Sequence, residues 1–277
     1  MSNIKFTRTR AKSYIKWITF SDNTETCKIV LGHPDDSVNC YHLQVNIEDA
    51  TRDLVRIGLV KDALERIGVP EITLHLPYFP QARADRVFEV GNPLPVRVFT
   101  GILNSYGFKK VTIYDPHSDV TPALINNCEV LKQDRLLKMA LPVINKQFTK
   151  EFTLCAPDLG ATKKTFDNMV ALGQDKYYQA IKVRDVKTGD IIKCDLIEDK
   201  IEGDVLIVDD ICDGSASFKF LAQKLKEKGA EKVGLYVTHG IFSKGLEVLK
   251  GSVDYIYVTN LVGNYVNQEN IRKFNES

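Results

Sequence analysis

The chain of 277 residues lacks any long apolar run, and no stretch approaches the ~20 consecutive apolar residues that a membrane-spanning helix needs. It also lacks an excess of either charge, because 37 basic and 36 acidic residues leave a net charge of +1. We therefore expect no nucleic-acid or membrane partner, although net charge does not exclude a local anion pocket. Residues 1–16 are polar and basic, without the apolar centre of a secretory signal, so a cytoplasmic protein is expected.

Cysteines in metal-binding or redox spacing are also missing. The chain has six cysteines without a C-x-x-C pair, and we interpret them as reduced thiols in a core large enough to need no disulfide. The sequence contains no G-x-x-x-x-G-K-[ST] loop for nucleotide phosphates and no evident Ser-His-Asp nucleophile arrangement. These absences exclude the commonest zinc, P-loop and serine-hydrolase sites.

One pattern does recur along the chain, namely a helical period, a glycine and a short strand. Val60, Ala63, Leu64 and Ile67 have helical spacing, Gly68 ends that helix, and residues 72–76 form an apolar strand. The same order recurs around Gly107 and Gly229. It predicts an α/β protein with mainly parallel sheets. The chain is expected to divide near residues 141 and 142, into domains 1–141 and 142–277.

In parallel sheets, ligands bind beyond the carboxyl ends of the strands, which directs attention to the residues after each predicted strand. The apolar strand 205–208 is followed by Asp209 and Asp210, and adjacent carboxylates need hydroxyl donors, a metal or a cation nearby. Small residues then run into a helix, whose amino end favours a phosphate. The segment predicts a ribose-phosphate site, with an acidic surface turn and a serine N-cap as the alternative. These small residues are Gly214, Ser215, Ala216 and Ser217.

Other strand-end segments carry cations and possible metal ligands. The guanidinium groups of Arg83 and Arg86 suit phosphate oxygens or a nucleotide base, although a surface ion pair with Asp85 is the alternative. His117 lies between two aspartates and could bind a metal or a triphosphate, but a lone histidine here is more often structural. Asp158 lies in a glycine-containing loop and could ligate Mg²⁺.

Lysines complete the set of candidate cations. Lys182 and Arg184 alternate on an extended segment and would point the same way, which suits an anion, although a solvated strand edge is the alternative. Lys163 and Lys164 are interpreted mainly as a solvated face, with a minor role in phosphate binding as the alternative.

Taken together, the motifs resemble those of the ribose-phosphate diphosphokinases, also called PRPP synthetases, in the order in which that family carries them. Residues 77–86, P-Y-F-P-Q-A-R-A-D-R, are similar to the family's P-Y-x-x-x-A-R-Q-D-R segment. Residues 115–119, 156–161 and 182–184 resemble its D-x-H, P-D-x-G and Lys-x-Arg segments. Residues 208–217, V-D-D-I-C-D-G-S-A-S, look like the ribose-phosphate loop of type I phosphoribosyltransferase folds.

This resemblance implies two tandem phosphoribosyltransferase-like domains, each a mainly parallel sheet flanked by helices, with ATP on the first and ribose phosphate on the second. It implies Mg²⁺-dependent transfer of pyrophosphate from ATP to ribose 5-phosphate in a homo-oligomer, a dimer or a hexamer. The implied roles are ATP binding by Phe20, Asp22, Arg83, Asp85, Arg86 and His117, metal binding by His117 and Asp158, ribose-phosphate binding by Asp209, Asp210, Asp213, Gly214, Ser215, Ala216 and Ser217, and catalysis by Lys182, Arg184 and His117.

Several positions depart from the family pattern. The family's opening strand, turn and helix are missing or reduced before Phe20, and Asn23 and Thr24 replace the Gly and Glu that follow its F-x-D. Ala84 replaces the usual Gln, and D-G-S-A-S replaces the usual D-T-[AG]-G-T phosphate loop. The acceptor could therefore be a substituted ribose 5-phosphate such as ADP-ribose. A phosphoribosyltransferase and a non-catalytic regulatory homologue remain as further alternatives.

Overall fold

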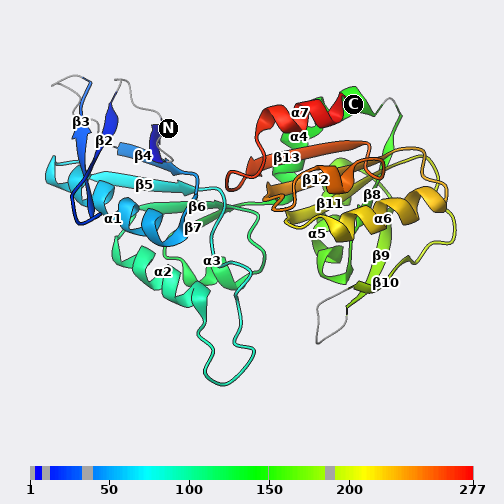
Figure 1. The fold of residues 1–277 in the computed structure, drawn as a ribbon, viewed down its shortest axis with the longest axis horizontal. Helices are drawn as coiled ribbons and strands as arrows, with labels where there is room; N and C mark the ends of the chain where they lie inside the picture. Colours follow the sequence, from blue (N-terminus) through cyan, green and yellow to red (C-terminus); the bar gives the residue numbers. More distant parts are fainter. Residues whose placement is uncertain (1–3, 8–12, 33–39, 149, 185–190, 277) are drawn as a thin grey trace. The chain divides into compact units, whose positions relative to one another are not determined.

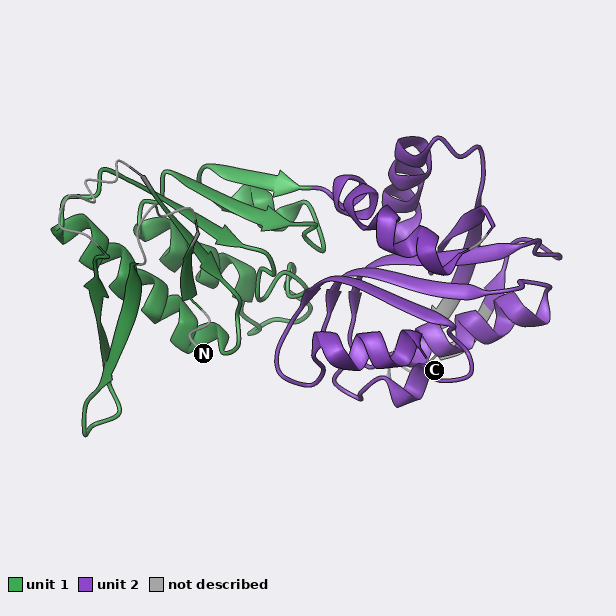
Figure 2. Cartoon of the chain, turned by 90° about the horizontal axis from the view of Figure 1, so that it is seen from above, with its two compact units in different colours: residues 1–131 green, residues 132–277 purple. Residues whose placement is uncertain are grey.

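The chain forms two compact units, residues 1–131 and 132–277 (Figure 2). The structure is a computed structural model that describes residues 4–7, 13–32, 40–148, 150–184 and 191–276. The units divide after Leu131, whereas the sequence had suggested a boundary at Leu141, which lies inside a helix. Each unit is described separately below.

Unit 1 is built on a five-stranded sheet in the order β1-β4-β5-β6-β7, in which only β1 runs antiparallel to its neighbour. A separate antiparallel pair is formed by β2 and β3. The elements are β1 (Ile4–Thr7), β2 (Tyr14–Thr19), β3 (Glu25–Val30), β4 (Cys40–Val45), α1 (Ala50–Arg66), β5 (Glu71–Leu76), α2 (Pro95–Ser105), β6 (Lys110–Tyr114), α3 (Val120–Leu124) and β7 (Cys128–Leu131).

Helices α1 and α2 cover one face of this sheet (Figure 1). The carboxylate of Asp49 accepts a hydrogen bond from the Arg52 amide and caps α1, while Pro95 opens α2, where its missing N–H costs nothing. The apolar period of α1, which includes Ile57 and Val60, packs on alternate strand residues such as Leu74. The loop that follows β5 is anchored to this core by Phe79 and Ala82.

Unit 2 has a six-stranded sheet in the order β10-β9-β8-β11-β12-β13, in which only β10 is antiparallel to its neighbour. Helices cover both faces of this sheet, as Figure 2 shows. The elements are α4 (Gln133–Gln147), β8 (Phe152–Ala156), η1 (Leu159–Ala161), α5 (Thr162–Leu172), β9 (Tyr177–Arg184), β10 (Ile191–Leu196), β11 (Asp204–Cys212), α6 (Ala216–Glu227), β12 (Val233–Gly240), η2 (Glu247–Leu249), β13 (Tyr255–Leu261) and α7 (Gln268–Asn275).

The central strand β11 is buried on both faces, as its continuous apolar run requires. Ile207 lies in the core beneath α6 and α7, while Leu206 and Val208 lie in the opposite core beneath α4 and α5. Strand alternation therefore assigns successive β11 residues to opposite helical layers.

The predicted α/β class with two mainly parallel sheets is confirmed, and the expected helix, glycine and strand units occur as α1–β5, α2–β6 and α6–β12. One detail was wrong: β11 does not end at Val208 but continues to Cys212, because β12 stays paired with it as far as Gly240. Asp209 and Asp210 are thus strand residues and not part of a surface turn. Among the described helices, none has the length and apolarity that crossing a membrane demands.

Candidate active site

The two adjacent acids of β11 project to opposite faces of the unit 2 sheet. Asp209 is paired in register with Val237, which packs beneath α6, so the Asp209 side chain lies on that face. Asp210 lies on the other face, where its Oδ2 is 3.3 Å from the Nζ of Lys164 in α5. The two side chains thus leave the strand on opposite faces, yet the carboxylates are close enough to act on each other.

Burial raises the pKa of the Asp209 carboxyl well above its ordinary value, and the negative charges of Asp210 and Asp158 raise it further. A hydrogen bond donated by the Asp210 amide to Asp209 Oδ1, at 2.9 Å, acts in the opposite direction but is outweighed. Three carboxylates therefore act on one another at this edge of the sheet. A ligand that supplies hydroxyl donors or positive charge would relieve this repulsion.

Lys164 brings positive charge to the acids from the first turn of α5. Its side chain is 29% exposed, whereas that of Asp210 is only 9% exposed. Lys163, the preceding residue, is exposed. The interpretation of both lysines as a solvated face is therefore wrong for Lys164, because the turn of α5 directs the two side chains differently.

The segment after β11 forms a tight loop at the amino end of α6. Ser215 is buried and has a left-handed backbone with φ of 67°, which non-glycine residues seldom adopt. The Ser243 hydroxyl donates a hydrogen bond to Asp213 Oδ1 at 2.5 Å and fixes the loop to the segment after β12. Helix α6 has no acidic residue in its first turn and no side-chain cap, so its positive end is not offset by its own residues.

Asp158 and the Lys-x-Arg segment lie at the same edge of the sheet, because β8, β9 and β11 are parallel. The Asp158 carboxylate accepts a hydrogen bond from the Ala161 amide at 3.2 Å. A side chain at Gly160 would approach Asp158 Oδ1 to 3.2 Å, so glycine keeps this carboxylate accessible. Lys182 and Arg184 lie at the carboxyl end of β9, but their side chains lie outside the described part of the chain.

Unit 1 brings two strand-end loops together. Burial raises the pKa of Asp85, but the nearby Ser118 hydroxyl and the Arg86 guanidinium outweigh this effect and hold it below its ordinary value. Arg86 Nε lies 3.2 Å from Asp85 Oδ1, and the Arg86 side chain is 70% exposed. The ion pair that the sequence offered as the alternative is thus present between Asp85 and Arg86, but it leaves the guanidinium open to an anion. Arg83 is exposed as well.

The loop after β6 begins with an unusual backbone. Asp115 is buried and has a positive φ of 31°, and its amide donates to the Leu131 carbonyl at 3.0 Å. His117 follows as an exposed residue. Of the six described non-glycine residues with positive φ, Gln81, Asp115 and Ser215 lie in strand-end loops marked by the sequence motifs, and the others are Asn23, Asn127 and Phe242. Such backbone strain is typical of ligand-binding loops.

The remaining unit 1 candidates, Phe20 and Asp22, lie at the tip of the β2–β3 hairpin. Phe20 is 52% exposed, and Asp22 Oδ1 accepts hydrogen bonds from the Thr24 amide at 3.0 Å and hydroxyl at 2.7 Å. The turn end of the hairpin is fixed to α1, because Arg56 forms a two-pronged ion pair with Glu25 and stacks over Trp17. Thr24 thus closes the turn and also occupies the Asp22 carboxylate.

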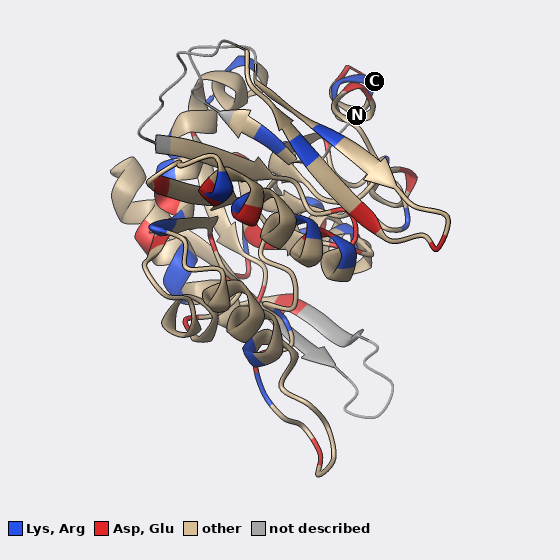
Figure 3. Cartoon of the chain, turned by 90° about the vertical axis from the view of Figure 1, so that its left-hand side faces the viewer, with Lys and Arg blue, Asp and Glu red and all other residues tan. Residues whose placement is uncertain are grey.

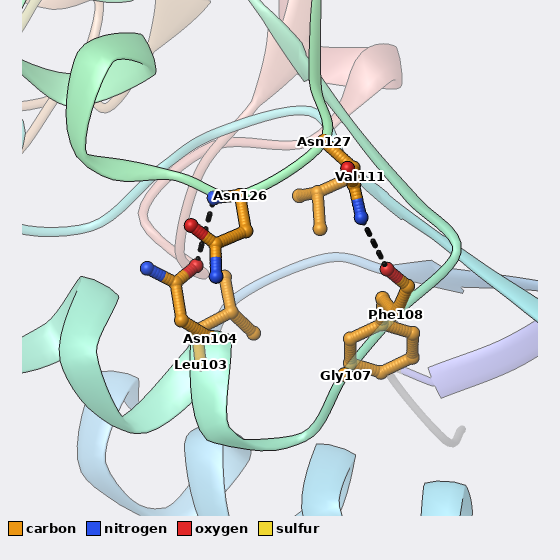
Figure 4. A pocket seen from close by; sticks show the side chains of 7 residues that line it. All are labelled: Leu103, Asn104, Gly107, Phe108, Val111, Asn126 and Asn127. Carbon is orange, nitrogen blue, oxygen red and sulfur yellow. Dashed lines mark hydrogen bonds between the residues drawn. The ribbon is translucent and has the colours of Figure 1, made fainter.

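Other features of unit 1 suit a structural role better than a binding role. Figure 4 shows a cavity of about 100 Å³ at the amino ends of β6 and β7, far along the strands from the candidate loops. Its asparagines form hydrogen bonds with the backbone: Asn104 bonds the Asn126 amide and the Leu124 carbonyl, and Asn127 bonds the Phe108 carbonyl.

On the face shown in Figure 3, basic and acidic residues lie side by side along the helices, as the near-zero net charge predicts.

The donor set can be tested against a magnesium ion. Within the described ranges, no three or more His, Cys, Asp or Glu side chains gather as a metal cage. Mg²⁺ rarely needs such a cage, because it is commonly held by one or two carboxylates and the phosphates of a substrate. The accessible Asp158 carboxylate fits that arrangement.

Comparison with known proteins identifies the family. The model of the phosphoribosyl synthetase-associated domain matches residues 180–276. The ribose-phosphate pyrophosphokinase of Chromobacterium violaceum is 30% identical over 227 residues, covering 79% of this chain and 67% of that protein. The protein of the same name from Thermococcus kodakarensis is 29% identical over 217 residues, covering 76% of this chain and 73% of that protein.

A solved structure agrees with the fold. Phosphoribosylpyrophosphate synthetase from Mycobacterium smegmatis matches with a TM-score of 0.71 at 19% sequence identity, over 89% of this chain and 80% of that one. Fold and strand-end loops thus define a two-unit α/β protein with the type I phosphoribosyltransferase fold. The chain belongs to the ribose-phosphate pyrophosphokinase family, as a divergent member.

Proposed function

We propose that this chain transfers the β,γ-pyrophosphate of ATP to the anomeric hydroxyl of ribose 5-phosphate. The hydroxyl oxygen attacks the β-phosphorus, the bond from that phosphorus to the α,β-bridging oxygen breaks, and AMP leaves with that oxygen. The hydroxyl proton is released and the product is 5-phosphoribosyl 1-pyrophosphate. Family membership supports this reaction, but one feature of the chain carries it.

That feature is the acid pair of β11 with a small-residue loop directly behind it. Asp209 and Asp210 would accept hydrogen bonds from the ribose hydroxyls, which would also ease the repulsion that raises the Asp209 pKa. The 5-phosphate would lie against the loop from Asp213 to Ser217, at the positive end of α6. Both ends of a ribose 5-phosphate thus have matching chemistry within nine residues of one another, 209–217.

The nucleotide would be held by unit 1. Arg83 and Arg86 offer exposed guanidinium groups to its phosphates, and Asp85 orients Arg86. Phe20 and Asp22 would contribute from the hairpin, and His117 from the loop after β6. Asp158 in unit 2 and His117 in unit 1 are each proposed as a ligand for Mg²⁺, which would neutralise phosphate charge when bound. The assembly is proposed to be a cytoplasmic homo-oligomer, a dimer or a hexamer.

Lys182 and Arg184 are the proposed catalytic cations, with His117. Both lie in the last three residues of β9, at the edge of the sheet that carries the acids. In pyrophosphoryl transfer the protein mainly positions the groups and stabilises developing negative charge, which two cations on one side of a strand can do.

The direct test is incubation with ATP, Mg²⁺ and ribose 5-phosphate, followed by identification of the products by mass. Stoichiometric AMP and 5-phosphoribosyl 1-pyrophosphate are expected. Formation of a nucleotide from 5-phosphoribosyl 1-pyrophosphate and a base, without ATP, would instead indicate a phosphoribosyltransferase. Absence of turnover with every acceptor offered, by a folded protein, would indicate a non-catalytic homologue.

One observation favours a second acceptor, a ribose 5-phosphate with a further group on its phosphate, such as ADP-ribose. Gly214 stands where the family usually has threonine, and within the described part of the chain nothing lies within 4 Å of a β-carbon placed there. This open space beside the proposed phosphate site would admit a substituent. ADP-ribose therefore forms the second arm of the assay, with the Gly214→Thr variant expected to lose that acceptor before ribose 5-phosphate.

A further inference from the structure

A buried glutamine contacts the backbone between the two acids. Gln133 is the first residue of α4 and only 4% exposed. Its Nε2 donates a hydrogen bond to the carbonyl oxygen of Asp209 at 2.7 Å and another to Thr238 Oγ1 at 3.2 Å. One side chain thus ties α4 to β11 and to β12 at the level of the acids.

The carbonyl that Gln133 holds belongs to the peptide group that joins Asp209 to Asp210. This group is planar, so its orientation sets the directions in which both carboxylates leave the chain. The pairing of β8 with β11 ends at Ile207, and beyond that residue β12 is the strand that continues beside β11. The acid pair therefore lies where β11 is paired with β12 but no longer with β8. A hydrogen bond from a side chain can take the place of the pairing that β8 no longer provides.

A second buried amide sets the orientation of the first. Asn168 in α5 is fully buried, and its Nδ2 donates to Gln133 Oε1 at 2.7 Å. This bond places the Gln133 oxygen toward α5 and leaves its Nε2 facing Asp209 and Thr238. Among the described residues, Asn168 Oδ1 and Thr165 Oγ1 nearby find no hydrogen-bond partner.

We propose that Gln133, oriented by Asn168, is a positioning residue that holds the Asp209–Asp210 peptide in the geometry that binds the acceptor ribose. The inference rests on the proposed function for the identity of the ligand. Gln133 touches no substrate in this account and acts through the backbone of the acids.

The chain contains a matched control. Gln174 Nε2 donates to the carbonyl oxygen of Phe152 at 2.7 Å, at the amino end of β8, and its Oε1 is also buried without a partner in the described structure. Gln174→Met and Gln133→Met therefore each remove a glutamine bond to a strand carbonyl in the same unit, and Gln133→Met also loses the bonds to Thr238 and Asn168. The two bonds lie at opposite ends of the sheet.

We expect Gln133→Met to raise the KM for ribose 5-phosphate about 10- to 100-fold, with the KM for ATP changed by less than about twofold, because misplaced groups lose binding and rate steeply. Gln174→Met should leave both constants near those of the wild type. Thermal unfolding of both variants shows the loss of stability that they share. Equal effects of the two variants on acceptor KM, or none for Gln133→Met, would overturn the proposal.

Two further measurements separate this inference from the proposed function. Backbone hydrogen exchange should rise in the peptide 205–217 in Gln133→Met but not in Gln174→Met, and this readout needs no activity; unchanged exchange overturns the tether even if the wild type is inactive. Asn168→Ser should raise the KM for ribose 5-phosphate less than Gln133→Met does. The double variant should have a KM no higher than that of Gln133→Met alone, because Asn168 acts through Gln133. Additive effects of the two substitutions on this KM would overturn the role of Asn168 in orienting Gln133.

Discussion

The Nζ of Lys164 lies 3.3 Å from the Oδ2 of Asp210. Helix α5 thus supplies a cation to an acid that lies far from it in the sequence. Six residues of chain separate Lys164 from Asp158 and 46 from Asp210, yet the side chain reaches the edge of the sheet where all three acids lie. This relationship yields the first prediction.

Lys164→Met should lower stability by about 1–2 kcal/mol, less than for a fully buried pair because the lysine is partly exposed. Turnover with ribose 5-phosphate should fall as well, since the Asp210 carboxylate loses a nearby positive charge. Lys163→Met is the control and should change the free energy of unfolding by less than about 0.5 kcal/mol. Denaturant titration and AMP release measure the two effects. Equal behaviour of the two variants would refute the role of Lys164.

Asp209 gives a prediction about pH. Its pKa is raised in the folded protein, chiefly by burial, so the unfolded chain loses this proton first as pH rises. The free energy of unfolding therefore falls as pH rises above the pKa of the unfolded chain, near pH 4. The full cost is reached at the raised pKa of the folded protein and remains at higher pH. Asp209→Asn should melt at a higher temperature than the wild type around pH 7 in metal-free buffer, with the advantage shrinking toward about pH 4. Its acceptor binding should be lost. Calorimetry would contradict this if the variant melted lower at every pH.

Ser215 gives a prediction about backbone strain. A left-handed serine costs about 1–2 kcal/mol and glycine costs nothing there, but glycine gains about 0.4–1 kcal/mol of freedom when unfolded. Ser215→Gly should therefore be neutral or stabilising by up to about 1 kcal/mol. Ser217→Gly, inside α6, should be destabilising by about 1 kcal/mol. Thermal melts of the pair compare them directly, and a less stable Ser215→Gly would show that the serine hydroxyl matters more than its backbone.

Lys182 gives a prediction about catalysis. Lys182→Ala should reduce turnover about 10²–10³-fold with little change in melting temperature, because it removes a preorganised cation. Lys176→Ala, just before the same strand, is the control, since that lysine lies over the Tyr178 ring, 5.8 Å from its centroid. Single-turnover AMP release is the measurement. A loss of less than a few-fold for Lys182→Ala would exclude a transition-state role.

The α/β architecture could be predicted because local sequence patterns indicate its helices and strands. Apolar residues at helical spacing with a following glycine marked α1 and α6, and short apolar runs marked β5 and β12. The end of β11 was missed, because acidic residues are uncommon in strands and only the pairing with β12 keeps them there. The boundary expected near Leu141 and Pro142, because strand-and-loop units resume at Phe152, falls inside α4, which continues through Pro142 with Leu137 and Ile144 buried on either side.

The candidate site could be predicted only in part. Its motifs marked the loops, and the structure brings Asp85 near Ser118 and fixes Asp213 to Ser243. The contact of Lys164 with Asp210 and that of Gln133 with Asp209 were not predicted, since the partners lie 46 and 76 residues away and a helix turn decides where each side chain points. No local pattern in the sequence signals such contacts.

The alternation of β11 has a consequence for how this chain can vary in length. Because Asp209 and Asp210 face opposite helical layers, one residue inserted or deleted between Asp204 and Asp209 would exchange the layers that the two carboxylates face. It would also move the acids relative to Lys164. Natural and engineered insertions should therefore be tolerated before Asp204 and be absent from the strand itself.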